Sequence, residues 1–145
     1  MAHTLCTRDE IVTMVHNFYG RIRQDALLGP IFNTHITDWD THLATMVEFW
    51  SSLLLGTASF QGRPMPKHAA LPSLSAPLFH HWLALFKDTT NNLGNDALAQ
   101  RAQEFSRRIA RQLWLGYQIS NTPSKQPEDL FAPHNMPATT EPSPS

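Results

Sequence analysis

The sequence of 145 residues has little of what defines several large protein classes. A single cysteine, Cys6, excludes an intramolecular disulfide framework and is typical of a reducing compartment. The chain has 11 basic and 12 acidic residues, and its formal net charge is −1. No excess of positive charge therefore points to a nucleic acid as a partner.

Long hydrophobic runs are also missing. The longest, such as Leu53-Leu54-Leu55, are far shorter than the ~20 apolar residues that span a bilayer. The N-terminal residues lack the basic start and the apolar stretch of a signal peptide. We therefore expect a cytoplasmic protein that does not enter a membrane.

Apolar residues make up 41% of the chain and recur mostly at helical spacing, which is enough to form the core of one domain. Thr7-Arg8-Asp9-Glu10 has the form of a capping box, and Gly56 and Asn91-Asn92-Leu93-Gly94 are typical helix ends. A turn is expected at Leu28–Phe32. The pattern predicts an all-α fold with helices over about residues 8–24, 38–55, 76–90 and 96–117.

The last 25 residues, 121–145, have a different composition and contain six of the 11 prolines, mixed with Ser, Thr and Glu. Such a segment buries too little apolar surface to offset the entropy lost on ordering. We therefore predict one folded domain over residues 1–120 and a disordered tail over 121–145. Leu130 and Phe131 are the only apolar spot in this tail, and we expect them not to dock.

Two of the eight histidines stand out by their surroundings. His68 lies between Pro66 and Pro72, on a segment too short for more than about one helical turn. A histidine held there suits an axial metal ligand, and it suits a polar connector equally well. His42 lies on the apolar face of its predicted helix, either as a hydrogen-bonded core residue or in a pocket.

The other histidines have weaker signals. His80 and His81 adjoin Trp82. Either one of them approaches the edge of a ligand or, as we predict, both are exposed at the surface. No pair of histidines or cysteines has the spacing of a zinc site.

Two hydrogen-bond donors lie on the core side of their predicted helices. Tyr19 and Trp82 are either large core residues or residues whose polar atoms line a cavity. Together with His42 and His68 they supply a phenol, an indole and two imidazoles facing one interior rich in Phe and Trp. Haem requires flat apolar walls, an axial imidazole and distal donors, so the pattern permits a haem pocket without establishing one.

A family resemblance makes this more specific. The sequence resembles the truncated haemoglobins, and the third (P-type) group in particular, over about residues 8–118. It lacks the paired glycines of the other truncated groups. The resemblance rests on these runs, in chain order: Phe18-Tyr19-Gly20-Arg21-Ile22-Arg23, Leu28-Gly29-Pro30-Ile31-Phe32, Trp39-Asp40-Thr41-His42, Phe49-Trp50, Leu54-Leu55-Gly56, Lys67-His68, Leu71-Pro72 and Trp82-Leu83-Ala84-Leu85-Phe86.

The resemblance implies a two-over-two helical sandwich that binds haem b, the iron protoporphyrin IX. By this resemblance His68 is the proximal ligand of the haem iron, Tyr19 and Trp82 are distal hydrogen-bond donors, and His42 is the distal histidine. Further residues expected to contact the cofactor are Phe32, Met46, Phe49, Leu71 and Phe79.

The implied function is the binding of O2, NO, CO or peroxide at a pentacoordinate-type ferrous haem. Two distal donors slow the release of O2, which favours redox chemistry such as NO dioxygenation or peroxide reduction over delivery. No flavin- or nicotinamide-binding segment is seen, so an unidentified reductase is expected as partner. The alternatives are an O2 or NO sensor, a reversible O2 store, and a haem-free helical interaction module.

Overall fold

The computed structural model describes residues 5–57 and 74–131, and every regular element within these ranges is a helix. The prediction of an all-α fold is confirmed. No helix in these ranges has the length and apolar character needed to cross a membrane. The helices are α1 (Arg8–Gln24), α2 (Gly29–His35), α3 (Trp39–Leu55), α5 (Ala76–Asn91) and α6 (Asp96–Asn121).

The helices begin and end at residues whose chemistry is visible in the sequence. The Thr7 hydroxyl accepts the Glu10 N–H, and the Glu10 carboxylate accepts the Thr7 N–H, which completes the predicted capping box. Asp38 and Ser75 cap α3 and α5 in the same way, with side-chain oxygens that accept backbone N–H groups. Gly56 ends α3 with a φ of 68°, in the left-handed region that favours glycine.

Two segments differ from the predicted pattern. The expected turn at Leu28–Phe32 contains the beginning of α2, where a proline in the first turn is already preset for a helix. The last helix continues to Asn121 instead of ending near Tyr117. Its extension is stabilised from outside, because the Gln118 amide donates to the Glu128 carbonyl at 2.8 Å and accepts the Glu128 N–H at 2.9 Å.

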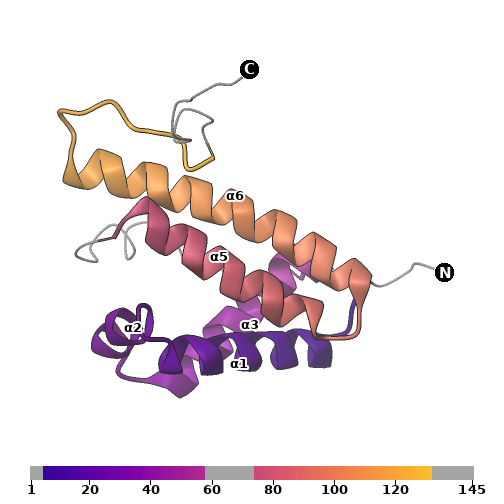
Figure 1. Ribbon diagram of the computed structural model, residues 1–145. Coiled ribbons are helices and arrows are strands. Elements are labelled where there is room, and N and C mark those ends of the chain that lie inside the picture. Colours follow the sequence, from indigo (N-terminus) through magenta and orange to yellow (C-terminus); the bar gives the residue numbers. More distant parts are fainter. Residues whose placement is uncertain (1–4, 58–73, 132–145) are drawn as a thin grey trace.

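The helices form two pairs (Figure 1). α5 runs beside α6 in one pair, α1 packs on α3 in the other, and α1 also contacts α5. This is the expected two-over-two arrangement. The main core lies where the pairs meet, and there the Phe18 ring of α1 packs edge-on against the Phe86 ring of α5, with centroids 4.8 Å apart.

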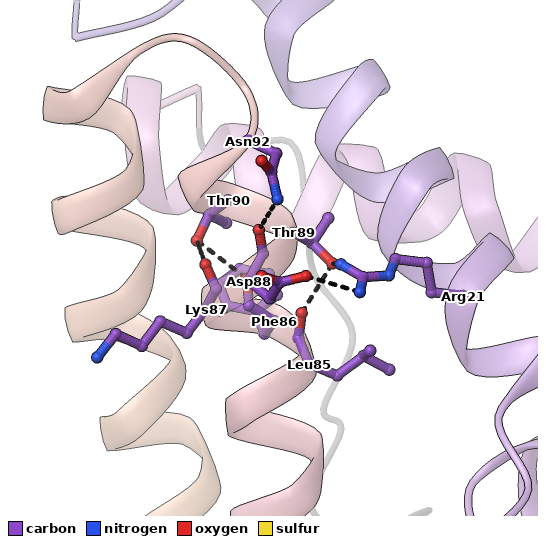
Figure 2. A network of polar contacts seen from close by, with 8 residues as sticks. All are labelled: Arg21, Leu85, Phe86, Lys87, Asp88, Thr89, Thr90 and Asn92. Carbon is purple, nitrogen blue, oxygen red and sulfur yellow. Dashed lines mark hydrogen bonds and ion pairs between the residues drawn. The ribbon is translucent and has the colours of Figure 1, made fainter.

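A polar network ties α1 to α5 on the outside of this core (Figure 2). The Arg21 guanidinium donates to the Thr89 hydroxyl at 2.9 Å and pairs with the Asp88 carboxylate at 2.7 Å. The Thr89 hydroxyl in turn donates to the Leu85 carbonyl at 2.8 Å. An ion pair this exposed adds less than about 1 kcal/mol to stability. Its geometry nevertheless fixes how α1 lies along α5.

The chain after α6 turns back over that helix (Figure 1). Leu130 is only 1% exposed and packs in a second apolar cluster with Phe79, Ala110 and Leu113. Our expectation that Leu130 stays undocked is therefore wrong. The boundary at residue 120 stays a prediction, and residues 132–145 lie outside the described part of the chain.

Gly29, at the beginning of α2, lies so close to the end of α1 that a side chain does not fit. A Cβ at Gly29 would lie 2.9 Å from the Arg23 carbonyl oxygen and 3.3 Å from that of Ile22. These oxygens belong to a helix backbone and move only with it. We expect Gly29→Ala to lower the free energy of unfolding by about 1–3 kcal/mol, measured by urea denaturation.

Gly20→Ala is the matched control for this substitution. Gly20 lies within α1, and a Cβ there would meet nothing within 4 Å. Because alanine favours the helix more than glycine does, we expect Gly20→Ala to raise the free energy of unfolding by about 0.5–1 kcal/mol. Two variants that changed stability in the same direction would contradict the close contact at Gly29.

Candidate functional site

An apolar cleft lies between α1, α2, α5 and α6. It encloses about 560 Å³ of space between atoms, part of it open to solvent. Four of the residues that the sequence singled out line it together: Tyr19, Phe32, Phe79 and Trp82.

Tyr19 places a phenol in this cleft from the buried face of α1. Its side chain is 6% exposed, and its ring packs edge-on against Phe32 with centroids 6.2 Å apart. Burial raises the pKa of the Tyr19 phenol above its ordinary value. The hydroxyl therefore keeps its proton throughout the physiological pH range and remains a hydrogen-bond donor.

His42, in the first turn of α3, lies against the same tyrosine. The imidazole meets the Tyr19 ring edge-on, with centroids 5.0 Å apart and planes at 87°. Trp39 packs against both rings, at 5.6 Å from His42 and 6.1 Å from Tyr19. The Arg23 guanidinium covers Trp39 at 4.5 Å. The structure thus brings Tyr19 and His42 together, and Trp39 joins them.

Trp82 lines the cleft from α5 as the end of a stack of three rings. Its ring lies parallel to that of Phe86, with centroids 5.8 Å apart, and the Phe86 ring stacks on Trp50 at 5.3 Å. Phe18 meets Trp82 edge-on at 5.4 Å. Rings packed on these sides allow the indole little rotation.

The lining of the cleft is apolar and includes the phenol of Tyr19 and the indole of Trp82. Comparison with known proteins identifies the family. No protein-family profile matches the chain. A group 3 truncated haemoglobin of Campylobacter jejuni is 33% identical over 115 residues, which span 74% of this chain and 91% of that protein. The chain belongs to the group 3 truncated haemoglobins.

A solved structure supports the same family. The crystal structure of a group III truncated haemoglobin from Campylobacter jejuni superposes with a TM-score of 0.70 at 32% sequence identity. The match covers 78% of this chain and 92% of the crystallised one. The resemblance found in the sequence and the truncated globin fold that it implied are both confirmed.

In this truncated haemoglobin an acid–imidazole pair lies beside the cleft. The Nε2 atom of His81, which precedes Trp82 in α5, lies 2.7 Å from a carboxylate oxygen of Asp25. The other Asp25 oxygen accepts the N–H groups of Leu27 and Leu28, each at 2.9 Å. One side chain therefore joins the turn between α1 and α2 to α5.

The electrostatics of Asp25 follow from these contacts. Burial acts to raise the pKa of the Asp25 carboxyl, but the hydrogen bonds from Leu28, His81 and Leu27 outweigh it and hold the pKa below its usual value. Asp25 is therefore ionised at neutral pH. The His81 ring, which we predicted to be exposed, is half-buried and held against this carboxylate.

Met46 and Phe49, also predicted to contact the cofactor, do not line this cleft. Met46 is half-buried against the main core on α3. Phe49 lines a second apolar hollow, between α3 and α6, and Leu113 borders both this hollow and the first cleft. His68 and Leu71 fall outside the described residues, so their roles stay predictions.

Sequence reasoning missed Trp39 and Leu113 as part of the site. Trp39 carried a usable signal, since it precedes His42 by three positions and so shares its helix face. Leu113 carried none, because an apolar residue on the inner face of a long helix looks like any other core residue. Its place between two hollows depends on the packing of α6 against both α5 and α3.

Proposed function

We propose that this truncated haemoglobin binds haem b in the cleft and holds small ligands such as O2, NO, CO or peroxide against Tyr19 and Trp82. His68 is the proposed axial ligand of the iron, on the strength of the family resemblance. The proposed chemistry is redox turnover of the ligand, as NO dioxygenation or peroxide reduction. A separate reductase supplies the electrons.

One observation carries this proposal: the phenol of Tyr19 and the indole of Trp82 line the same apolar cleft. An apolar wall excludes water, and a donor is worth more where water does not compete. The two donors come from different helices, α1 and α5, which the Arg21 network and the Phe18 contacts hold in register. The site is therefore preorganised for an acceptor placed between them.

When haem is present, its iron would bind the diatomic ligand and transfer charge to it. The chain supplies the polar contacts. Tyr19 donates its O–H, which burial keeps protonated, and Trp82 donates its Nε1–H, since an indole has no acceptor. A hydrogen bond to a charge-bearing acceptor contributes roughly 1.5–3 kcal/mol. Both contacts act to retain a ligand rather than to release it.

The two proposed reactions use the distal residues differently. In NO dioxygenation, O2, NO and one electron become nitrate, and the donors hold O2 in place while NO arrives. In peroxide reduction, peroxide takes two electrons and two protons and becomes water, and His42 carries a proton as general acid and base. The contact between His42 and Tyr19 places that imidazole beside the phenol.

The first test is haem uptake by the purified chain. We expect wild-type protein to take up one haem per chain and to give ferric, ferrous, O2-bound and CO-bound spectra of a histidine-ligated globin. We expect His68→Ala to lose the axial-histidine signature, because the substitution removes the imidazole that is proposed to bind the iron. Optical absorbance in the Soret region measures both.

His16→Ala is the control for this test. His16 is exposed on α1, so its removal should leave all four spectra unchanged. A wild-type protein that takes up no haem would overturn the proposed function and favour a haem-free helical module. A His68→Ala protein with an unchanged axial-histidine spectrum would overturn the assignment of the ligand alone.

A further inference from the structure

Four residues after α6 lie against the two helices that form one wall of the cleft. We call this segment, Glu128–Phe131, the C-terminal clamp. Its Leu130 is 1% exposed in the cluster with Phe79, Ala110 and Leu113. A leucine this buried is shielded from water as completely as a core residue of α1 or α5.

Polar contacts hold the clamp along its length. The Asp129 carboxylate accepts two hydrogen bonds from the Arg111 guanidinium, at 2.9 and 2.5 Å. The backbone of Glu128 makes the paired contact with the Gln118 amide. The Leu130 carbonyl accepts the Nε2–H of His80 at 3.1 Å, and the Phe131 ring meets the His80 ring edge-on. Contacts with both α5 and α6 therefore fix the position of Leu130.

The clamp and the cleft share their wall. Phe79, Ala110 and Leu113 line the cleft, and the same three side chains pack against Leu130. Space left by removing Leu130 would let these side chains shift away from the cleft, since tightly packed groups keep their positions only while their neighbours remain. Leu130 thus supports the cleft without lining it.

We propose that the C-terminal clamp is a positioning element of the cofactor site. By holding Phe79 and Leu113 in place it keeps the wall closed on the cofactor and slows the loss of haem. This inference rests on the proposed function. The resemblance read from the sequence covers about residues 8–118, so it assigns no role to the clamp.

The first arm of the test measures haem loss in the full-length protein. Transfer of haem to an excess of apomyoglobin should be about tenfold faster for Leu130→Ala than for wild type. Leu130→Met keeps most of the buried volume and should restore a rate within about twofold of wild type. The change should be in the rate of loss, with the axial-histidine spectrum of the loaded protein unaltered.

Leu98→Ala separates positioning from general destabilisation. Leu98 is fully buried in the main core, at the other end of α6, and does not belong to the cluster around Leu130. Both leucine truncations are expected to lower stability against urea by similar amounts. If haem loss accelerates equally in the two variants, Leu130 acts only through stability and the proposal is overturned.

The second arm tests docking without the cofactor. The Glu128 N–H donates to the Gln118 side chain at 2.9 Å, so hydrogen exchange at this amide should be slow in wild type and fast in Leu130→Ala. If the wild-type protein takes up haem but its Glu128 amide exchanges fast, only the clamp proposal is overturned. A wild-type protein that takes up no haem overturns the proposed function and the cofactor role of the clamp together.

Discussion

Tyr19→Phe is expected to speed the release of O2 from the ferrous protein by about 10- to 100-fold. The substitution removes one hydroxyl and keeps the ring that packs against Phe32 and His42. A hydrogen bond to a charge-bearing ligand is worth roughly 1.5–3 kcal/mol. Since about 1.4 kcal/mol changes a rate tenfold, loss of the bond before release accounts for the expected factor. Stopped-flow displacement of O2 by CO measures the rate.

Trp82→Phe is expected to act in the same direction, because it removes the Nε1–H while an aromatic ring still stacks on Phe86. Tyr117→Phe is the matched control. Tyr117, on α6, is the other tyrosine of the chain. Its hydroxyl oxygen accepts the Leu74 N–H, with 3.1 Å between the two atoms. Loss of that hydroxyl should leave the release of O2 within about twofold of wild type, because Tyr117 does not line the cleft.

These rates also separate the function classes. Slow release in wild type that accelerates in both distal variants supports a protein that retains O2 for reaction, and consumption of NO under O2 should fall in the same variants. Fast release in wild type would favour a reversible O2 store or a sensor. If neither Tyr19→Phe nor Trp82→Phe changed release or NO consumption, the proposed distal roles would be wrong.

Local chemistry made most of the helices predictable. The capping box at Thr7, the capping residues Asp38 and Ser75, and Gly56 act within one turn of the chain, so sequence spacing reveals them. The inward faces of Tyr19 and Trp82 follow from helical periodicity for the same reason. That these two residues line one cleft depends on how α1 lies on α5, and only the family resemblance indicated it beforehand.

Contacts between distant segments were not predictable from residue type. His81 and Asp25 are 56 positions apart, and each alone looks like a solvated surface residue. Their pairing needs the turn after α1 to meet α5, which periodicity does not describe. The same holds for Arg23 over Trp39, where a cation that belongs to α1 covers an indole of α3.

The wrong expectation for Leu130 shows the limit of a prediction from composition. Few apolar residues and many prolines predict disorder because most of the segment has nothing to bury. One leucine is nevertheless enough to dock a short stretch when the two residues before it, Glu128 and Asp129, bond to α6. Composition averages over the segment, whereas docking depends on a few adjacent residues.

The largest loss of stability is expected from Phe86→Ala. Phe86 is 1% exposed, and its ring contacts three others: Phe18 edge-on, and Trp50 and Trp82 in parallel stacking. Removing a fully buried phenylalanine leaves a cavity that the surrounding rings cannot fill, so we expect the free energy of unfolding to fall by about 3–5 kcal/mol. Urea denaturation followed by circular dichroism measures the change.

Phe105→Ala provides the comparison, since Phe105 is only half-buried, packs at the edge of the main core and lies beneath Arg101. Phe105→Ala should lower the free energy of unfolding by less than half as much as Phe86→Ala does, because less apolar surface returns to water. Equal losses at the two positions would contradict the placement of the core between the helix pairs. Because Phe86 stacks on Trp82, its removal should also free the indole and so speed the release of O2, which Phe105→Ala should not do.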